Sequence, residues 1–403
     1  MSRQWSGRMA RRCLGALSSQ SGVGRVAVLH RRFDSYHATA AAVHLDSRFL
    51  GSNNGELARG ERRVKTAFRI VLVAAIVLIA GIGVAAVKVL GPRAFLGPRS
   101  RPLTARTFES TPARLERGKY LANSIGCLYC HSPHDWKQDD DPIVAGMTGA
   151  GQQLPYIGLP GKVFAPNLTP DKETGAGDWT DDMLARAIRE GVGHDGRALF
   201  GIMPYAHYRN MPDEDLASII VYLRSLPAVK NPLPKTEIIF PVKYIIRNGP
   251  EPVTSPVPSP DLSDPVKRGR FLVNLTGCSD CHTPVDNHHM PIPGMEFSGG
   301  QVLEAPWGRV ASANLTPDPS GIPHYDEAIF IKAMRTGRVG ARELNKTMPW
   351  SVLRNMSDED LAGMFAYLKT LKPVSHRVDN TEKPTLCPLD GAMHGAGNQN
   401  RKE

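Results

Sequence analysis

Cysteine is scarce in this chain of 403 residues, with six in all. Four of them form two short motifs, and the other two, Cys13 and Cys387, each stand alone in their region of the chain. This pattern excludes a disulfide framework of the kind that small secreted domains use. The informative cysteines are therefore the four in the motifs.

Two further absences narrow the class of protein. The chain has no regular stripe of Lys and Arg interleaved with aromatic residues, so its formal net charge of +10 does not indicate a nucleic-acid-binding face, and no nucleic acid partner is expected. It also has no segment with a sustained, strand-like alternation of apolar and polar residues. We therefore expect an all-α fold, with loops that use many of the 38 glycines and 33 prolines.

Acidic residues are absent before Asp34, in a stretch where Arg and Ser are frequent. Mitochondrial transit peptides have this composition. A start placed too far upstream is the alternative, because a chain that began at Val64 would open with a compact signal anchor behind a basic segment. On either interpretation, residues 1–66 form an N-terminal extension to which we assign no folded function.

Charged residues are absent again from Ile70 to Val87, a run of eighteen residues with a basic residue on each side. A helix of roughly 20 apolar residues crosses a hydrocarbon core, and the apolar residues after Lys88 bring this run close to that length. The run is longer than the apolar region of a usual signal peptide, and it lacks the polar face of a core helix. We therefore predict a transmembrane anchor over residues 67–90 and a linker over residues 91–109.

The frame Gly-Cys-x-x-Cys-His-x-Pro occurs twice, as GCLYCHSP over residues 126–133 and as GCSDCHTP over residues 277–284. Its surroundings repeat with it, because each copy is followed by an NLTPD segment, an A-x-R-x-G segment and a Met-Pro pair. This repetition predicts a duplicated domain. The expected parts are domain 1 over residues 110–229, a Pro-rich linker over 230–262, domain 2 over 263–375 and a tail over 376–403.

Helical periodicity places three helices in each copy. One precedes the cysteines and ends at the glycine before them, and another begins near Thr180 in the first copy and near Asp326 in the second. The last helix has apolar residues at i, i+3, i+4 and i+7 and opens with Asp-Glu-Asp, with Ser357 as its N-cap in the second copy. The apolar middle of the linker is expected to lie along a domain surface.

The Cys-x-x-Cys-His spacing is compatible with three kinds of site. A zinc site needs four ligands, but each frame supplies only three, with His134 or His288 as candidates for the fourth. A thioredoxin-like pair needs a βαβ context, which an all-α copy does not offer. A c-type haem fits, because thiols three residues apart reach the two vinyl groups of one porphyrin edge and the adjacent histidine reaches the iron. The predicted attachment residues are Cys127, Cys130, Cys278 and Cys281, and the predicted proximal ligands are His131 and His282.

The Met-Pro pair of each copy offers a second iron ligand. Electron carriers close the far face of the iron, and a soft methionine thioether raises the reduction potential. Met203 and Met348 occupy equivalent positions in the two copies and are predicted to be these axial ligands. Met211 and Met356 stand eight residues further on, at the start of a helix, and are predicted to cap or pack.

This series of motifs resembles the bacterial class I cytochrome c domains, over Ala113 to Pro373 and in two copies. It is similar above all to cytochrome subunits that accept electrons from membrane-associated alcohol, aldehyde or related dehydrogenases. Three-haem members of that group carry a third attachment frame, which this chain lacks. The resemblance therefore implies two tandem class I cytochrome c domains after a single N-terminal transmembrane helix, with two covalently attached haem c groups.

The resemblance also implies contacts inside each copy. The first and last helices should cross, which would bring Gly118 near Tyr222 and Gly269 near Tyr367. The resemblance suggests that four residues of the NLTPD segments lie beside the haem edge or its propionates, namely Asn167, Thr169, Asn314 and Thr316. The alternative is that Asn-Leu-Thr-Pro forms an ordinary turn.

The function expected from these residues is electron transfer without catalysis. We expect a membrane-anchored dihaem cytochrome c that carries electrons from a dehydrogenase or a quinol to a terminal oxidase or a soluble cytochrome. Its anchor would lie in the inner (cytoplasmic) membrane, with the haem domains on the periplasmic side, where haem is attached. The alternative is a dihaem cytochrome c peroxidase, which also has two such frames but needs one iron with an open face.

Overall fold

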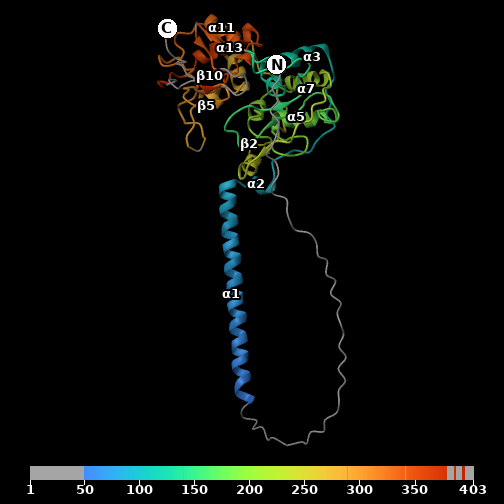
Figure 1. The fold of residues 1–403 in the computed structure, drawn as a ribbon, viewed down its shortest axis with the longest axis vertical. Helices are drawn as coiled ribbons and strands as arrows, with labels where there is room; N and C mark the ends of the chain where they lie inside the picture. The colour runs from blue at the N-terminus through green and yellow to red at the C-terminus, as the bar shows by residue number, and fades with distance from the viewer. Residues whose placement is uncertain are drawn as a thin grey trace, which may run out of the picture. The chain divides into compact units, whose positions relative to one another are not determined.

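The computed structural model describes residues 50–138, 140–287, 289–340, 342–378, 385–386 and 393–394. Cys13, Cys387 and His288 lie outside the described residues, as do most of the predicted N-terminal extension and much of the tail. The chain divides into two compact units between Ala74 and Ala75, inside the long helix α1 (Leu50–Leu90). Both copies of the repeated motif belong to the second unit (Figure 1).

Helix α1 contains the predicted anchor. Within it, Arg59–Leu90 spans 32 residues and reaches a mean hydropathy of 3.0, and no other helix of the described residues is long and apolar enough to cross a membrane. Its apolar side chains are exposed, as at Val77, which is 65% accessible. These properties are compatible with a membrane anchor, and the helix starts well before residue 67, where the sequence analysis began the anchor.

The first copy is organised around two long helices that flank the cysteine motif and the methionine. The N-cap of α3 is Thr111, whose side chain accepts a hydrogen bond from the Arg114 amide. The N-cap of α5 is Thr180, which confirms that this helix begins near Thr180. The helices are α3 (Pro112–Ser124), α4 (Cys127–Cys130), α5 (Asp181–Glu190), α6 (Tyr205–Tyr208) and α7 (Asp213–Ser225).

The second copy repeats this order. Ser357, the predicted N-cap, and Asp326, near which a helix was expected to begin, each accept a hydrogen bond from the amide three residues on, which confirms both helix starts. Figure 1 draws α11 and α13 in one group and α3, α5 and α7 in another. The helices are α9 (Pro265–Leu275), α10 (Cys278–His282), α11 (Glu327–Thr336), α12 (Trp350–Leu353) and α13 (Asp358–Lys369).

Short antiparallel ladders supplement the helices. They have two to four residues in each strand, which is too short for the alternation by which a strand is predicted from sequence. The expectation of an all-α fold thus holds for the framework but not for these loops. The pairs are β1 (Gln152–Gln153) with β3 (Phe164–Ala165), β2 (Gly161–Lys162) with β4 (Glu237–Ile238), β5 (Val302–Ala305) with β6 (Gly308–Ala311), β7 (Arg338–Val339) with β8 (Arg342–Glu343), and β9 (Thr385–Leu386) with β10 (Met393–His394).

The first and last helices of each copy cross at a glycine. A Cβ on Gly118 of α3 would lie 1.9 Å from the Ser218 carbonyl oxygen and 2.8 Å from the Tyr222 Cβ, so the predicted contact is confirmed. A Cβ on Gly269 of α9 would lie 1.8 Å from the Gly363 carbonyl oxygen, and Tyr367 is not among its three nearest neighbours. The backbones approach so closely that only glycine fits at either crossing.

Each copy has its own hydrophobic core. The first cluster includes Leu121, Ile219 and Ile220, and the second includes Leu361 and Met364, all less than 3% exposed. Leu275, from the end of α9 in the second copy, belongs to the first cluster. The two copies are therefore packed against each other as well as being internally closed.

The linker between the copies is ordered along the first copy. Its strand β4 pairs with β2, and the next residues form α8 (Val242–Ile245) and the short 3-10 helix η1 (Ile246–Asn248). These pack against α2 (Arg93–Leu96), which follows α1. The apolar middle of the linker thus lies along a domain surface, as expected.

Candidate functional site

The two cysteines of the first motif sit on one helical turn, α4. Gly126 begins that turn in the left-handed region, with φ of 90°, which other residues adopt only with strain. The His131 amide ends it by donating to the Cys127 carbonyl oxygen at 2.9 Å. Gly277 and α10 repeat this arrangement at Cys278 and Cys281, and none of these four cysteines is in a disulfide.

The histidine of each motif is held by a backbone carbonyl. His131 Nδ1 lies 2.8 Å from the Pro166 carbonyl oxygen, and His282 Nδ1 lies 2.7 Å from the Ala313 carbonyl oxygen. A carbonyl can only accept, so Nδ1 carries the proton in each ring and Nε2 keeps its lone pair. Burial lowers the pKa of both imidazoles, which favours this neutral form. Nε2 of each ring is thus prepared to bind a metal.

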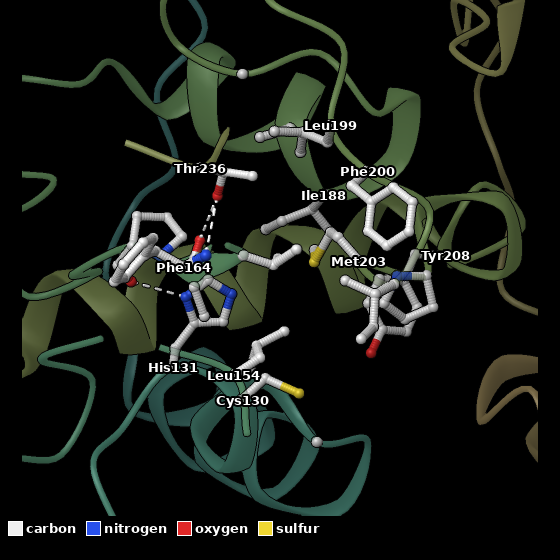
Figure 2. Close-up of a pocket in the computed structure, with 18 of the residues that line it drawn as sticks. Cys130, His131, Leu154, Phe164, Ile188, Leu199, Phe200, Met203, Tyr208 and Thr236 are labelled. Carbon is white, nitrogen blue, oxygen red and sulfur yellow. Dashed lines mark hydrogen bonds between the residues drawn. The ribbon is translucent and has the colours of Figure 1, made fainter. Parts of the chain in front are cut away.

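The predicted axial methionines occupy equivalent turns. The Met203 amide donates to Phe200 O at 3.0 Å, and the Met348 amide donates to Asn345 O at 2.9 Å. Each methionine packs beside the hydrophobic core of its own copy. In Figure 2, the Met203 sulfur and the His131 nitrogen that is not bonded to a carbonyl both face the interior of one pocket.

The repeated A-x-R-x-G segment explains how the methionine turn is positioned. Gly191 ends α5 with φ of 73°, and a Cβ there would lie 2.7 Å from the Tyr205 ring. Gly337 ends α11 with φ of 66°, and its Cβ would lie 2.4 Å from the Trp350 ring. Each aromatic ring follows its Met-Pro pair directly, so the glycine lets that ring pack closely and fixes the turn.

The residues of the first site line a cavity of about 1500 Å³. Ligand pockets for drug-sized molecules measure ~300–1,000 Å³, so this space is large enough for a porphyrin. The second copy contributes to the same wall with residues that include Thr276 and Cys281. Residues of the first site on the wall are Cys127, Cys130, His131 and Met203, accompanied by apolar side chains such as Leu154, Ile188 and Tyr208.

The thiols do not have the properties of a redox pair. Burial raises the pKa of Cys127 to about 12 and those of Cys130 and Cys281 to about 11, and it also raises the pKa of Cys278. Reactive thioredoxin-like cysteines have lowered values instead. The thiols are therefore protonated at neutral pH and lie in surroundings of low polarity.

The zinc interpretation finds no support in the described part of the chain. That part contains no group of three or more His, Cys, Asp and Glu side chains that could hold a metal ion. His134, a candidate fourth ligand, is buried, and its two ring nitrogens contact the carbonyl oxygens of Asp141 and Tyr129. The other candidate, His288, lies outside the described residues. Two thiols and an imidazole beside a large apolar cavity fit a covalently attached haem better.

The methionines that were predicted to pack are deeply buried. Met211 is 0% exposed in the first core and Met356 is 2% exposed in the second. Neither lines the large cavity. Packing is therefore the role that the structure gives them.

The expectation that the NLTPD side chains lie beside the haem gains no support from the cavity in the first copy. Asn167 and Thr169 do not line the cavity. The Asn167 side chain accepts from the Thr169 amide at 2.9 Å and donates to the Val229 carbonyl at 2.7 Å. In the second copy, Asn314 makes the same bonds to Thr316 and to the Val374 carbonyl. These side chains close a turn and hold the end of each copy, because short polar side chains satisfy nearby backbone groups.

Sequence reasoning missed two features of the site. One is the pair of carbonyl acceptors, Pro166 and Ala313, which each precede an NLTPD segment by one residue; that repeat was the signal that could have found them. The other is a group of aromatic rings between the copies, in which Trp307 lies 5.3 Å from Trp136 and 6.1 Å from Tyr156 between ring centroids. Nothing in the spacing of these rings along the chain indicates that they meet.

Comparisons with known proteins point in the same direction. No protein-family model matches the chain. It is 27% identical over 66% of its length to the fructose dehydrogenase cytochrome subunit of Gluconobacter japonicus and 29% identical over 72% to the gluconate 2-dehydrogenase cytochrome c subunit of Pantoea cypripedii. It is 26% identical over 72% to a diheme cytochrome c-type protein of Cereibacter sphaeroides.

The matches differ in how much of each relative they span. They cover 55% of the fructose dehydrogenase subunit, so the chain spans about half the length of that relative. They cover 67% of the gluconate 2-dehydrogenase subunit and 97% of the diheme protein. The chain is therefore homologous to cytochrome c subunits of dehydrogenases and to a dihaem c-type cytochrome, at modest identity over much of its length.

Proposed function

We propose that the chain is a membrane-anchored dihaem cytochrome c that carries electrons and catalyses no reaction of its own. The observation that carries this proposal is the repeated site, in which two thiols on one turn stand beside a histidine whose Nδ1 is held by a backbone carbonyl. Homology to cytochrome subunits supports the same conclusion. The proposal assigns one class I cytochrome c domain to residues 110–229 and a second to residues 263–375.

The residues of the first copy have distinct roles in this proposal. Cys127 and Cys130 would hold haem through thioether bonds, and His131 and Met203 would be the residues that bind its iron. The haem, when bound, supplies one-electron chemistry, because its iron alternates between ferrous and ferric states. Pro166 keeps the imidazole in the tautomer that can bind iron. In the second copy, Cys278, Cys281, His282 and Met348 would take the same roles.

Cationic side chains on the cavity wall would hold the haem propionates. Arg197 and Arg247 line the cavity with the first site, whereas Asn167 and Thr169 do not. Arginine pairs well with carboxylates because its planar fork donates two parallel hydrogen bonds. We prefer this assignment to the expectation that the NLTPD side chains contact the propionates, because the two arginines line the cavity.

The cavity wall also supports electron transfer between the two copies. Cys130 of the first copy and Cys281 of the second line the same cavity, together with Tyr156. Groups attached to these two cysteines would therefore share one low-polarity space. An electron that enters through one copy could leave through the other without crossing bulk water.

The partners and location follow from the relatives and from α1. The relatives belong to fructose, gluconate and alcohol dehydrogenases by name, so we propose a dehydrogenase or a quinol as electron donor. A terminal oxidase or a soluble cytochrome would be the acceptor. The anchor α1 would hold the chain in the inner membrane with both copies in the periplasm, where haem attachment occurs.

A peroxidase is not supported as an alternative. The named relatives are electron-transfer cytochromes. A peroxidase also needs one iron with an open face, whereas both copies have a methionine in the same hydrogen-bonded turn. Equivalent closed sites favour outer-sphere electron transfer in both copies.

Haem counting tests the proposal. The purified chain should keep two haems under denaturing conditions, measured by haem absorbance per chain and by the intact mass. Cys127→Ala and Cys278→Ala should each remove about one haem, whereas Cys387→Ala, outside both motifs, should remove none. A chain that binds zinc and no haem would refute the proposal.

A further inference from the structure

The linker segment that contains β4, α8 and η1 carries an unusual set of exposed apolar side chains. Ile239 is 57% exposed, Phe240 is 72% exposed and Ile245 is 42% exposed. None of the three lines the large cavity, so haem binding would not cover them. Outside α1, Phe95 and Phe240 are the exposed phenylalanines of the described residues, and Phe95 lies in α2, which packs against α8. Exposed apolar patches of this kind mark interaction surfaces.

Hydrogen bonds fix this segment to the end of α1. The Asn248 side-chain amide donates to the Leu90 carbonyl and to the Ile245 carbonyl, both at 2.8 Å. Its oxygen accepts from the Arg93 amide at 3.3 Å, and Arg247 donates to the Ala94 carbonyl at 2.8 Å. Leu90 is the last residue of α1 and of its apolar stretch. The Asn248 amide thus links the Ile245 carbonyl to the point where that stretch ends.

The close fit at this junction leaves little freedom to the segment. Gly91 follows α1 with φ of 80°, and a Cβ there would lie 2.3 Å from the Asn248 side-chain oxygen. The Gly91 amide donates to the Val87 carbonyl and so closes the last turn of α1. The position of α8 relative to the end of α1 is thus set by packing and by three hydrogen bonds, one to Leu90 and two to α2.

The polar residues of the segment match the surface of a bilayer. The Lys243 ammonium lies 5.1 Å from the Tyr244 ring centroid, and the Arg247 guanidinium lies 4.7 Å from it. Phe240 meets the same ring edge-on, with centroids 6.1 Å apart. Aromatic rings and basic groups beside exposed apolar side chains are the composition of membrane-surface segments, because the rings enter the headgroup region and the cations attract anionic lipid.

We propose that Ile239, Phe240 and Ile245 form a membrane-surface patch that inserts into the outer headgroup region of the bilayer that α1 crosses. This inference rests on the proposed role of α1 as an anchor. The occupant is the lipid itself, because the patch adjoins the end of the apolar stretch and includes Lys243 among its neighbours, a residue that is exposed, whereas Arg247 is assigned to the haem propionates. The patch holds the first copy against the bilayer at a fixed height. A flexible linker without such a patch would let the first copy move away from the bilayer.

Photo-crosslinking of the full chain in lipid vesicles tests the patch. The photoreactive residue p-benzoylphenylalanine is placed at Phe240 or Ile245, and at Met290 as a control, which is 60% exposed in the second copy and apart from this segment. Haem content verifies that each variant is folded. In vesicles of phosphatidylethanolamine and phosphatidylglycerol, intact mass should show lipid adducts severalfold more abundant at Phe240 and Ile245 than at Met290.

The other outcomes separate the patch from the anchor. Alkaline carbonate tests the anchor, because it extracts proteins that do not cross the bilayer. If the chain resists this extraction but lipid adducts are as rare at Phe240 and Ile245 as at Met290, the patch is overturned and the anchor is not. Extraction by carbonate would overturn both. If the same variants in native membranes crosslink to another protein in place of lipid, the assignment of lipid as occupant is wrong.

Discussion

At the scale of single residues, the chemistry of the site depends on which atom of each side chain is available. His131 and His282 have the same environment, a buried ring with Nδ1 bonded to a carbonyl, although the carbonyls belong to different residue types. The acceptor is backbone, so it is insensitive to substitution of the side chain that carries it. The metal-binding tautomer is therefore a property of the local chain path around each site.

The identity of the sixth ligand gives a prediction at this scale. Met203→Ala should retain haem, because Cys127 and Cys130 are proposed to attach it, but should open the iron and produce a high-spin form that binds carbon monoxide. Met203→His should keep a low-spin iron with a lower reduction potential, since the soft thioether is lost. Optical spectroscopy with carbon monoxide and redox titration measure both results.

Met211 provides the matched control. It is buried in the core beside the site but does not line the cavity, so Met211→Ala should leave the haem spectrum unchanged. It should instead lower the free energy of unfolding by ~2–5 kcal/mol, as expected for a large-to-small change in a packed core. If the Met211 variant has a high-spin spectrum and the Met203 variant does not, Met211 binds the iron and Met203 packs in the core.

At the scale of elements, segments predicted to be linkers turn out to be bound to the helices. Arg101, in the predicted linker over residues 91–109, forms a bidentate ion pair with Asp182 at 2.7 and 2.8 Å. It also contacts Glu190 at 2.8 Å, so it binds both ends of α5. The Asp182 side chain is fully buried, and its carboxylate accepts a further bond from the Thr104 amide at 2.7 Å. The segment that follows α1 is therefore part of the first copy.

This ion pair predicts a dependence of stability on pH. Burial raises the pKa of Asp182, but the bonds from Arg101 and Thr104 outweigh it and hold the pKa at about 2, below the ordinary 3.8. A depressed folded-state pKa gives stability that is present above pH 3.8 and is lost as the pH falls toward 2. Asp182→Asn should lower the free energy of unfolding by about 2 kcal/mol at pH 7. Between pH 3.8 and 2, that free energy should then depend less on pH than it does in the unchanged chain.

Urea unfolding from pH 2 to 7, followed by far-ultraviolet circular dichroism, checks this expectation. The control is Asp178→Asn, an exposed aspartate two residues before the N-cap of α5, which should change the stability by less than about 0.5 kcal/mol. If the free energy of unfolding of the Asp182 variant falls as steeply with decreasing pH as that of the unchanged chain, the Asp182 carboxylate is not the group responsible.

At the scale of the whole molecule, the two copies are joined by ion pairs, of which one is buried and another is exposed. Lys346 of the second copy lies 2.9 Å from Asp141 of the first, and their side chains are 12% and 4% exposed. Arg354 and Asp140 form a second pair nearby at 3.4 Å, with side chains 41% and 52% exposed. Removing one partner of a buried pair leaves the other as a buried charge, whereas an exposed pair contributes little.

These two pairs predict unequal effects. Lys346→Met should destabilise the chain by about 3 kcal/mol, while Arg354→Met should cost less than about 1 kcal/mol. The double variant with Asp141→Asn should recover much of the loss, since Asn tolerates the positive φ of 47° at that position. Guanidinium unfolding measures all three. Equal losses for Lys346→Met and Arg354→Met would mean that the buried pair does not hold the copies together.

The sequence by itself determined the features that depend on neighbours along the chain. The helix starts at Thr180, Asp326 and Ser357 follow from short motifs, because caps and helical faces are set within a few residues. The two Cys-x-x-Cys-His motifs are equally local, and attachment of haem to them remains a prediction. The equivalence of Met203 and Met348 also came from the repeat, although their binding to iron remains a prediction.

Only the tertiary structure decided the features that join distant positions. The Pro166 acceptor for His131, the role of Asn167 in holding Val229, the ring contact of Trp136 with Trp307 and the attachment of Asn248 to Leu90 each join residues at least 35 positions apart. Local periodicity carries no information about which loops meet, because a backbone carbonyl or an aromatic ring finds its partner only when whole elements pack. The NLTPD segments illustrate this limit: their sequence was compatible with a turn or with a place beside the haem, and only the packed structure shows which backbone groups their side chains bind.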